Sequence, residues 1–155
     1  MMSKLNEVAK EFLAQPRIAV VGVSRTSQNT ANAIYNQLKK MGHEVFPINP
    51  NAETVEGDKA YPTLKDVPGG IENVLIVTRP EIAAKVAQDF IPAGVKRVWM
   101  HNNTLGPSSV SDEAVAFCKQ NNITVIAGAC PMMYIDPFHK TMRGVLGIMG
   151  RLPQV

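Results

Sequence analysis

The stretch IAVVGVSRTSQNTANAI, residues 18–34, decides how this chain folds. Four apolar residues run directly into Gly22, and apolar residues return at helical spacing from Ala31. This pattern is typical of a buried parallel strand, a tight turn and a covering helix. In a dinucleotide-binding G-x-G-x-x-G turn, two more glycines would stand where this chain has Ser24 and Ser27. The stretch keeps the strand-turn-helix architecture but not the glycines of that fingerprint.

Apolar runs and helical patterns alternate along the rest of the chain. They predict a short N-terminal helix before Pro16, strands over 18–21, 45–49, 73–78, 97–100 and 123–127, and helices over 31–41, 80–91 and 110–120. Ser109 with Asp112 resembles a capping box before the last helix, and the polar segment 50–70 is predicted to be mostly loop. We therefore predict an α/β fold, a Rossmann-like doubly wound sheet of five parallel strands with helices on both faces.

Composition limits the classes of protein to which the chain can belong. Its 155 residues, 45% of them hydrophobic, suit one domain over 1–155. A charged N-terminus and no apolar run of about 18 residues predict a soluble, cytoplasmic protein without membrane contact. The net charge of +3, spread along the chain, argues against nucleic acid and suits one small polyanion. The two cysteines and three histidines lack metal-binding spacings, so we expect no metal site.

The first turn can bind a phosphate group. A helix that starts after a strand offers free N–H groups and the positive end of its dipole. Ser24, Ser27 and Thr30 add hydroxyl groups, and Arg25 adds a positive charge. The alternative is an ordinary polar loop with a helix cap.

The second strand ends without the acidic residue that an NAD site would use to bind the ribose. That end reads Asn49-Pro50, while Glu44 stands at the beginning of the strand, away from the ligand edge. A neutral end would tolerate a phosphorylated ribose, which a carboxylate would repel. This argues against NAD.

Five segments together give the chain a family resemblance. It resembles the small stand-alone CoA-binding proteins, whose domain is similar to the N-terminal domain of the succinyl-CoA synthetase alpha subunit. The segments are VVGVSR at 20–25, VFPINP at 45–50, VTRPE at 77–81, RVWM at 97–100 and ACPMMY at 129–134.

The resemblance implies that coenzyme A lies across the carboxyl ends of the strands. Its phosphates would lie near Gly22, Ser24, Arg25 and the helix start, and its adenosine near Asn49-Pro50. Its pantetheine arm would pass Thr78, Arg79 and Pro80, as the resemblance implies.

No set of side chains in the sequence has a physical reason to converge as catalytic machinery. We therefore interpret the chain as a protein that binds CoA or an acyl-CoA without turnover. Two alternatives stay open, namely an NAD(P)-binding redox enzyme or sensor, and an interaction subunit whose nucleotide pocket is vestigial.

Two further features lie near the C-terminus. Residues 136–155 are basic and amphipathic, and we expect them to dock on the sheet, on a second subunit as a homodimer, or on a partner protein. Cys130 follows the last strand, at the edge where the CoA thiol would arrive. A mixed disulfide with that thiol is one hypothesis, but packing as a small buried hydrophobe is the favoured interpretation.

Overall fold

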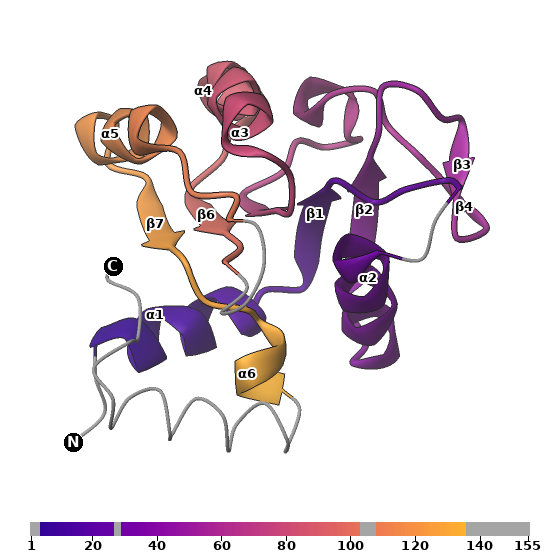
Figure 1. Ribbon diagram of the computed structural model, residues 1–155, viewed down its shortest axis with the longest axis horizontal. Coiled ribbons are helices and arrows are strands. Elements are labelled where there is room, and N and C mark those ends of the chain that lie inside the picture. The colour runs from indigo at the N-terminus through magenta and orange to yellow at the C-terminus, as the bar shows by residue number, and fades with distance from the viewer. Residues whose placement is uncertain (1–3, 27–28, 103–107, 136–155) are drawn as a thin grey trace.

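The computed structural model describes residues 4–26, 29–102 and 108–135. Five parallel strands form one sheet in the order β2-β1-β5-β6-β7, which confirms the predicted Rossmann-like doubly wound sheet (Figure 1). Two predicted strands, 45–49 and 73–78, end early because the backbone leaves the sheet to form connecting loops. The strands are β1 (Arg17–Val21), β2 (Glu44–Ile48), β5 (Asn73–Ile76), β6 (Arg97–Met100) and β7 (Thr124–Ala127).

Helices cover both faces of the sheet (Figure 1). On one face lie α1 (Lys4–Leu13), α2 (Thr30–Lys40) and the short α6 (Met132–Ile135), which was not predicted. The other face carries α3 (Pro80–Val86), α4 (Phe90–Ala93) and α5 (Asp112–Gln120), with the 3-10 turns η1 (Leu64–Asp66) and η2 (Ala87–Asp89).

The predicted helix 80–91 is broken into three pieces, α3, η2 and α4. Pro92 explains the break, since proline has no N–H and its ring opposes the carbonyl group four residues earlier. The other predicted helices are confirmed to within two residues at each end.

The strands supply the core by strict alternation. In β1, Ala19 and Val21 face α3–α5, while Ile18 and Val20 face α1 and α2. Trp99 of β6 is fully buried on the α1 side, and its ring meets that of Phe12 edge-on with centroids 5.5 Å apart. Each Å² of apolar surface that is buried in this way stabilises the fold by about 25 cal/mol. Helices therefore pack against both faces of the sheet.

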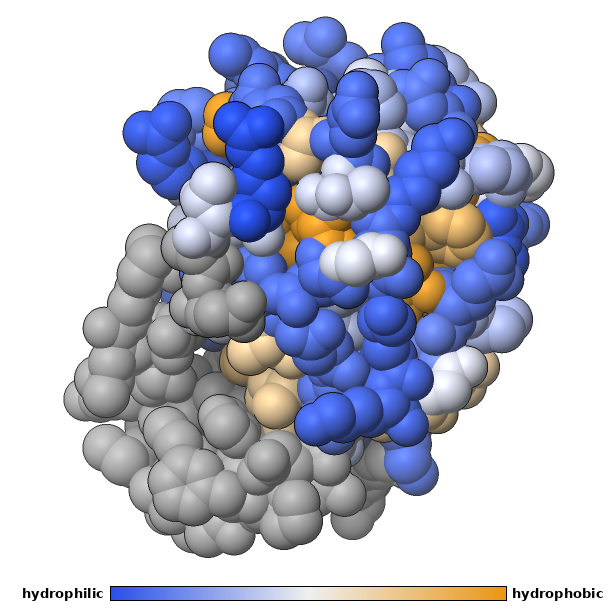
Figure 2. Space-filling model, turned by 90° about the vertical axis from the view of Figure 1, so that its right-hand side faces the viewer, coloured by the Kyte–Doolittle hydropathy of each residue, from blue (hydrophilic) through white to orange (hydrophobic). Residues whose placement is uncertain are grey.

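Segment 50–70 contains more structure than predicted. Strands β3 (Thr54–Val55) and β4 (Asp58–Lys59) form an antiparallel hairpin, and both turn residues, Glu56 and Gly57, have positive φ. Strands of two residues show no measurable periodicity, so the pattern missed them. Figure 2 shows the side of the molecule on which this hairpin and α2 lie, with small apolar areas between hydrophilic side chains.

The predicted capping box at Ser109 is wrong. Helix α5 starts at Asp112, and Ser111 is its cap, since the Ser111 hydroxyl accepts from the Ala114 N–H at 3.2 Å. Ser109 is 2% exposed and accepts a hydrogen bond from the N–H of Thr78 at 2.9 Å. The serine predicted to cap a helix instead connects two loops at the carboxyl edge of the sheet.

Within the described ranges, no helix is long and apolar enough to cross a membrane. The predicted docking segment 136–155 lies outside the described residues. Its role, the homodimer and the cytoplasmic location stay predictions.

Candidate functional site

The five residues that directly follow the ends of the five parallel strands form a row across the carboxyl edge of the sheet. The strand registers place them side by side. The N–H groups of residues 77, 101 and 128 still donate to the neighbouring strand, each at 2.9 Å. We call this set the edge row: Asn49, Gly22, Val77, His101 and Gly128, in the order of the sheet. In open α/β sheets, ligands bind at this edge where the winding reverses, here between β1 and β5.

Gly22 lies at that reversal and is held against the next strand. Its φ is +112°, and a Cβ atom there would lie 2.1 Å from the carbonyl oxygen of Val77. The same Cβ would lie 3.2 Å from a methyl group of Thr78. Two of the predicted site residues, Gly22 and Thr78, are thus brought together, and glycine is needed for the close approach of two backbones.

Asn32, buried in the first turn of α2, holds the turn after β1. Its Oδ1 accepts from the Ser24 N–H at 2.9 Å, and its Nδ2 donates to the Ser24 carbonyl at 2.8 Å. Asn32 is 1% exposed. The N–H and the carbonyl of Ser24 are therefore both engaged by one side chain within the protein.

We expect Asn32→Ala to lower the free energy of unfolding by about 2 kcal/mol, because both backbone groups of Ser24 lose a partner in a half-buried position. Urea denaturation followed by circular dichroism measures this. The matched control is Asn121→Ala, which removes one exposed bond to the Phe117 carbonyl and should change stability by no more than about 0.5 kcal/mol. Equal effects would show that Asn32 does not hold the turn.

The β3–β4 hairpin brings two carboxylates to α2. Glu56 accepts from Asn32 Nδ2 at 2.7 Å, and Asp58 accepts from Tyr35 and Lys39. Burial and the Asp58 carboxylate raise the pKa of the Tyr35 hydroxyl, and the bond from Lys39 lowers the pKa of Asp58. Sequence reasoning missed Glu56. An acidic residue does come close to the first turn, but from the hairpin and not from the end of β2.

The end of β2 is tied to the same turn. Asn49 donates to the carbonyl of Val23 at 3.0 Å and accepts from the N–H of Asn51 at 2.8 Å. Pro50, which follows it, is exposed. Glu44 lies at the opposite end of β2, as predicted, 3.8 Å from Arg17.

The other predicted site residues surround this edge with different degrees of exposure. Arg25, Thr30 and Arg79 are exposed, and Thr30 and Pro80 are the first residues of α2 and α3. The Thr78 hydroxyl donates to the Arg79 carbonyl at 3.1 Å. Ser27 lies outside the described residues.

His101, the fourth residue of the edge row, was not predicted as a site residue. Its side chain is 3% exposed, and its Nε2 has no hydrogen-bond partner among the residues that the structure describes. Burial lowers the pKa of His101 to about 4, so the imidazole is neutral at pH 7. The signal in the sequence was its position directly after a predicted strand.

The chain has relatives among known proteins. The sequence pattern of the CoA binding domain family matches residues 16–136. The chain belongs to the CoA-binding domain family. The match confirms the resemblance found in the sequence. That residues 1–155 form one such domain extends beyond the matched part and stays a prediction.

Relatives of the CoA-binding domain include stand-alone proteins and parts of longer enzymes. The uncharacterized protein YneT of Bacillus subtilis (strain 168) is 31% identical over 122 residues, which cover 78% of this chain and 87% of YneT. Acetate–CoA ligase (ADP-forming) of Methanocaldococcus jannaschii is 26% identical over 124 residues, which cover 77% of this chain but 18% of the ligase. A solved structure, of a hypothetical protein from Pyrococcus horikoshii OT3, superposes with a TM-score of 0.74 at 28% identity, covering 84% of this chain and 88% of that one.

The cysteines of the CoA-binding domain are both buried. Cys118 lies in α5 and packs in the core against the sheet, and burial raises the pKa of its thiol to about 12. Cys130 is 7% exposed and belongs to the cluster on the α1 and α2 side. Its burial supports the packing interpretation, while disulfide exchange with CoA stays untested.

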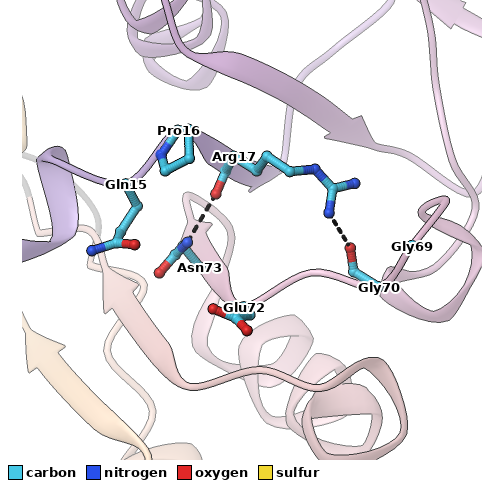
Figure 3. Close-up of a pocket in the computed structure, with 7 residues that line it drawn as sticks. All are labelled: Gln15, Pro16, Arg17, Gly69, Gly70, Glu72 and Asn73. Carbon is cyan, nitrogen blue, oxygen red and sulfur yellow. Dashed lines mark hydrogen bonds between the residues drawn. The ribbon is translucent and has the colours of Figure 1, made fainter.

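The CoA-binding domain also has a hollow of about 290 Å³ at the opposite, amino edge of the sheet (Figure 3). Arg17 donates to the Gly70 carbonyl at 2.9 Å, and Asn73 donates to the Arg17 carbonyl at 2.9 Å. The side-chain Oδ1 of Asn73 accepts from Arg97 at 3.1 Å. These polar groups already form hydrogen bonds within the protein, so we assign the hollow a structural role.

Proposed function

We propose that this CoA-binding domain binds coenzyme A or an acyl-CoA along the edge row and does not turn it over. The observation that carries the proposal is the convergence of three loops at the winding reversal. Gly22 lies against Val77 and Thr78 of the loop after β5, and Asn49 at the end of β2 donates to the Val23 carbonyl in the turn after β1.

The charges around the edge row suit the phosphates of CoA. The first turn of α2 contains no acidic residue of its own, so the side chains of this helix do not offset the positive end of its dipole. Arg25 is exposed in the turn before α2, Thr30 is the exposed first residue of that helix, and Ser24 belongs to the same turn. Ser27 follows in the sequence, outside the described residues. We assign the phosphates to this group, and the nearby Glu56 carboxylate is engaged by Asn32.

The rest of the ligand follows from the order of the strands. The adenosine would lie at Asn49 and Pro50, over β2, and the pantetheine arm would pass Thr78, Arg79 and Pro80. The absence of turnover is part of the proposal.

A ligand panel tests the proposed function. We expect CoA at a hundred times its Kd to stabilise the protein by about 2.7 kcal/mol in a thermal-shift assay, and NAD, NADP and ATP to stabilise it far less.

Arg25→Ala should weaken the binding of CoA by about 1.5–3 kcal/mol, because it removes a charge-assisted contact. The loss of binding free energy should be smaller for dephospho-CoA and pantetheine.

The control for this panel is Lys119→Ala, which removes an exposed cation at the end of α5. It should leave CoA affinity unchanged. A larger shift with NAD than with CoA would contradict the proposal. Equal losses for all three ligands in Arg25→Ala, measured by calorimetry, would contradict the role of Arg25.

A further inference from the structure

We propose that His101 donates a hydrogen bond from Nε2 to the thioester carbonyl of an acyl-CoA, and so makes the site selective for acyl-CoA over free CoA. This inference rests on the proposed function, since it assumes that CoA lies along the edge row. It concerns binding alone, and no bond to the ligand is made or broken.

The place of His101 is set by the sheet. It lies between Val77 and Gly128 in the edge row, and Gly128 has no side chain. By strand alternation its side chain is on the same face as that of Trp99, which is the face of α1 and α2. The start of α2, which we assign to the phosphates, covers this same face of the sheet.

The backbone of His101 is fixed to the loop assigned to pantetheine. The His101 carbonyl accepts from the Ser109 N–H at 2.8 Å, and the Ser109 hydroxyl accepts from the Thr78 N–H at 2.9 Å. Ser109 is itself 2% exposed. The backbone of His101 is therefore two hydrogen bonds away from Thr78, in the part of the edge row that we assign to the pantetheine arm.

The chemistry of the group favours a carbonyl as its partner. A neutral imidazole has one N–H donor, and a buried donor without a partner is unfavourable. A thiol is a weak hydrogen-bonding group, whereas a carbonyl oxygen is a strong acceptor. Free CoA would leave His101 poorly satisfied, and an acyl-CoA would satisfy it.

Calorimetry with four ligands tests the inference. The ligands are acetyl-CoA, free CoA, a thioether analogue that lacks the carbonyl, and adenosine 3′,5′-bisphosphate. We expect acetyl-CoA to bind about tenfold more tightly than CoA or the thioether. His101→Phe should remove this tenfold preference and leave the bisphosphate unchanged. His43→Gln is the matched control, because His43 bonds to the Gln15 carbonyl at the other edge, and it should keep the preference.

A second measurement needs no folded variant of His101. In the ¹⁵N NMR spectrum of the wild-type imidazoles, the His101 Nε2 signal should move with acetyl-CoA and not with the thioether analogue. Equal affinities for acetyl-CoA and the thioether, or an unmoved Nε2 signal, would overturn the role of His101 while CoA binding stands. If neither CoA nor the bisphosphate binds, the proposed function itself fails.

Discussion

Gly22→Ala is expected to lower the free energy of unfolding by about 3 kcal/mol or more and to abolish CoA binding. The new Cβ would lie 2.1 Å from the Val77 carbonyl oxygen, which belongs to the backbone of the central sheet and cannot rotate aside. The φ of +112° adds strain for any residue with a Cβ atom. Urea denaturation and calorimetry with CoA measure the two effects.

Gly42→Ala separates the effect of the steric clash from the effect of a positive φ. Gly42 also has a positive φ, +95°, but a Cβ there would meet nothing within 4 Å. We expect a loss of about 1–2 kcal/mol and unchanged CoA binding. If both alanine variants lost the same stability, the contact between β1 and β5 would not be what requires a glycine at position 22.

Acidification is expected to destabilise the wild-type protein more than His101→Gln. The pKa of His101 is about 4 in the folded protein and about 6.5 when unfolded, so between these values the unfolded chain binds the extra proton. Stability contributed by the neutral, buried imidazole is complete above pH 6.5 and lost as the pH falls through 4. The loss specific to His101 is about 3 kcal/mol.

Urea denaturation of both proteins between pH 7.5 and 4 gives the difference curve, in which groups common to both cancel. An NMR titration of the His101 ring in the folded protein locates its pKa directly. Parallel stability curves for the two proteins would contradict the effect of burial on this histidine.

The sequence was sufficient to predict the sheet, because buried parallel strands are apolar throughout and the helices between them have a clear period. It also predicted that Gly22, Asn49 and Thr78 belong to one edge, since each follows an apolar run. Single residues at strand ends are easy to find when the strand itself is well marked.

What the sequence did not predict depends on tertiary contacts. Asn32 and Glu56 meet only because a hairpin with two-residue strands folds back onto α2, and such strands have no pattern. Ser109 had the residue type and spacing of a cap, but its hydroxyl is used by Thr78. His101 becomes a candidate site residue only through the strand register, which places it beside Val77 and Gly128.

The position of Trp99 gives this protein a built-in optical signal. The chain has one tryptophan, so its fluorescence comes from a single known place. The indole N–H donates to the carbonyl of Gly128, a member of the edge row, at 3.0 Å, and the ring packs edge-on against Tyr134. A ligand that shifts the carboxyl edge near Gly128 would alter the emission of this buried indole, and binding could then be followed without a label.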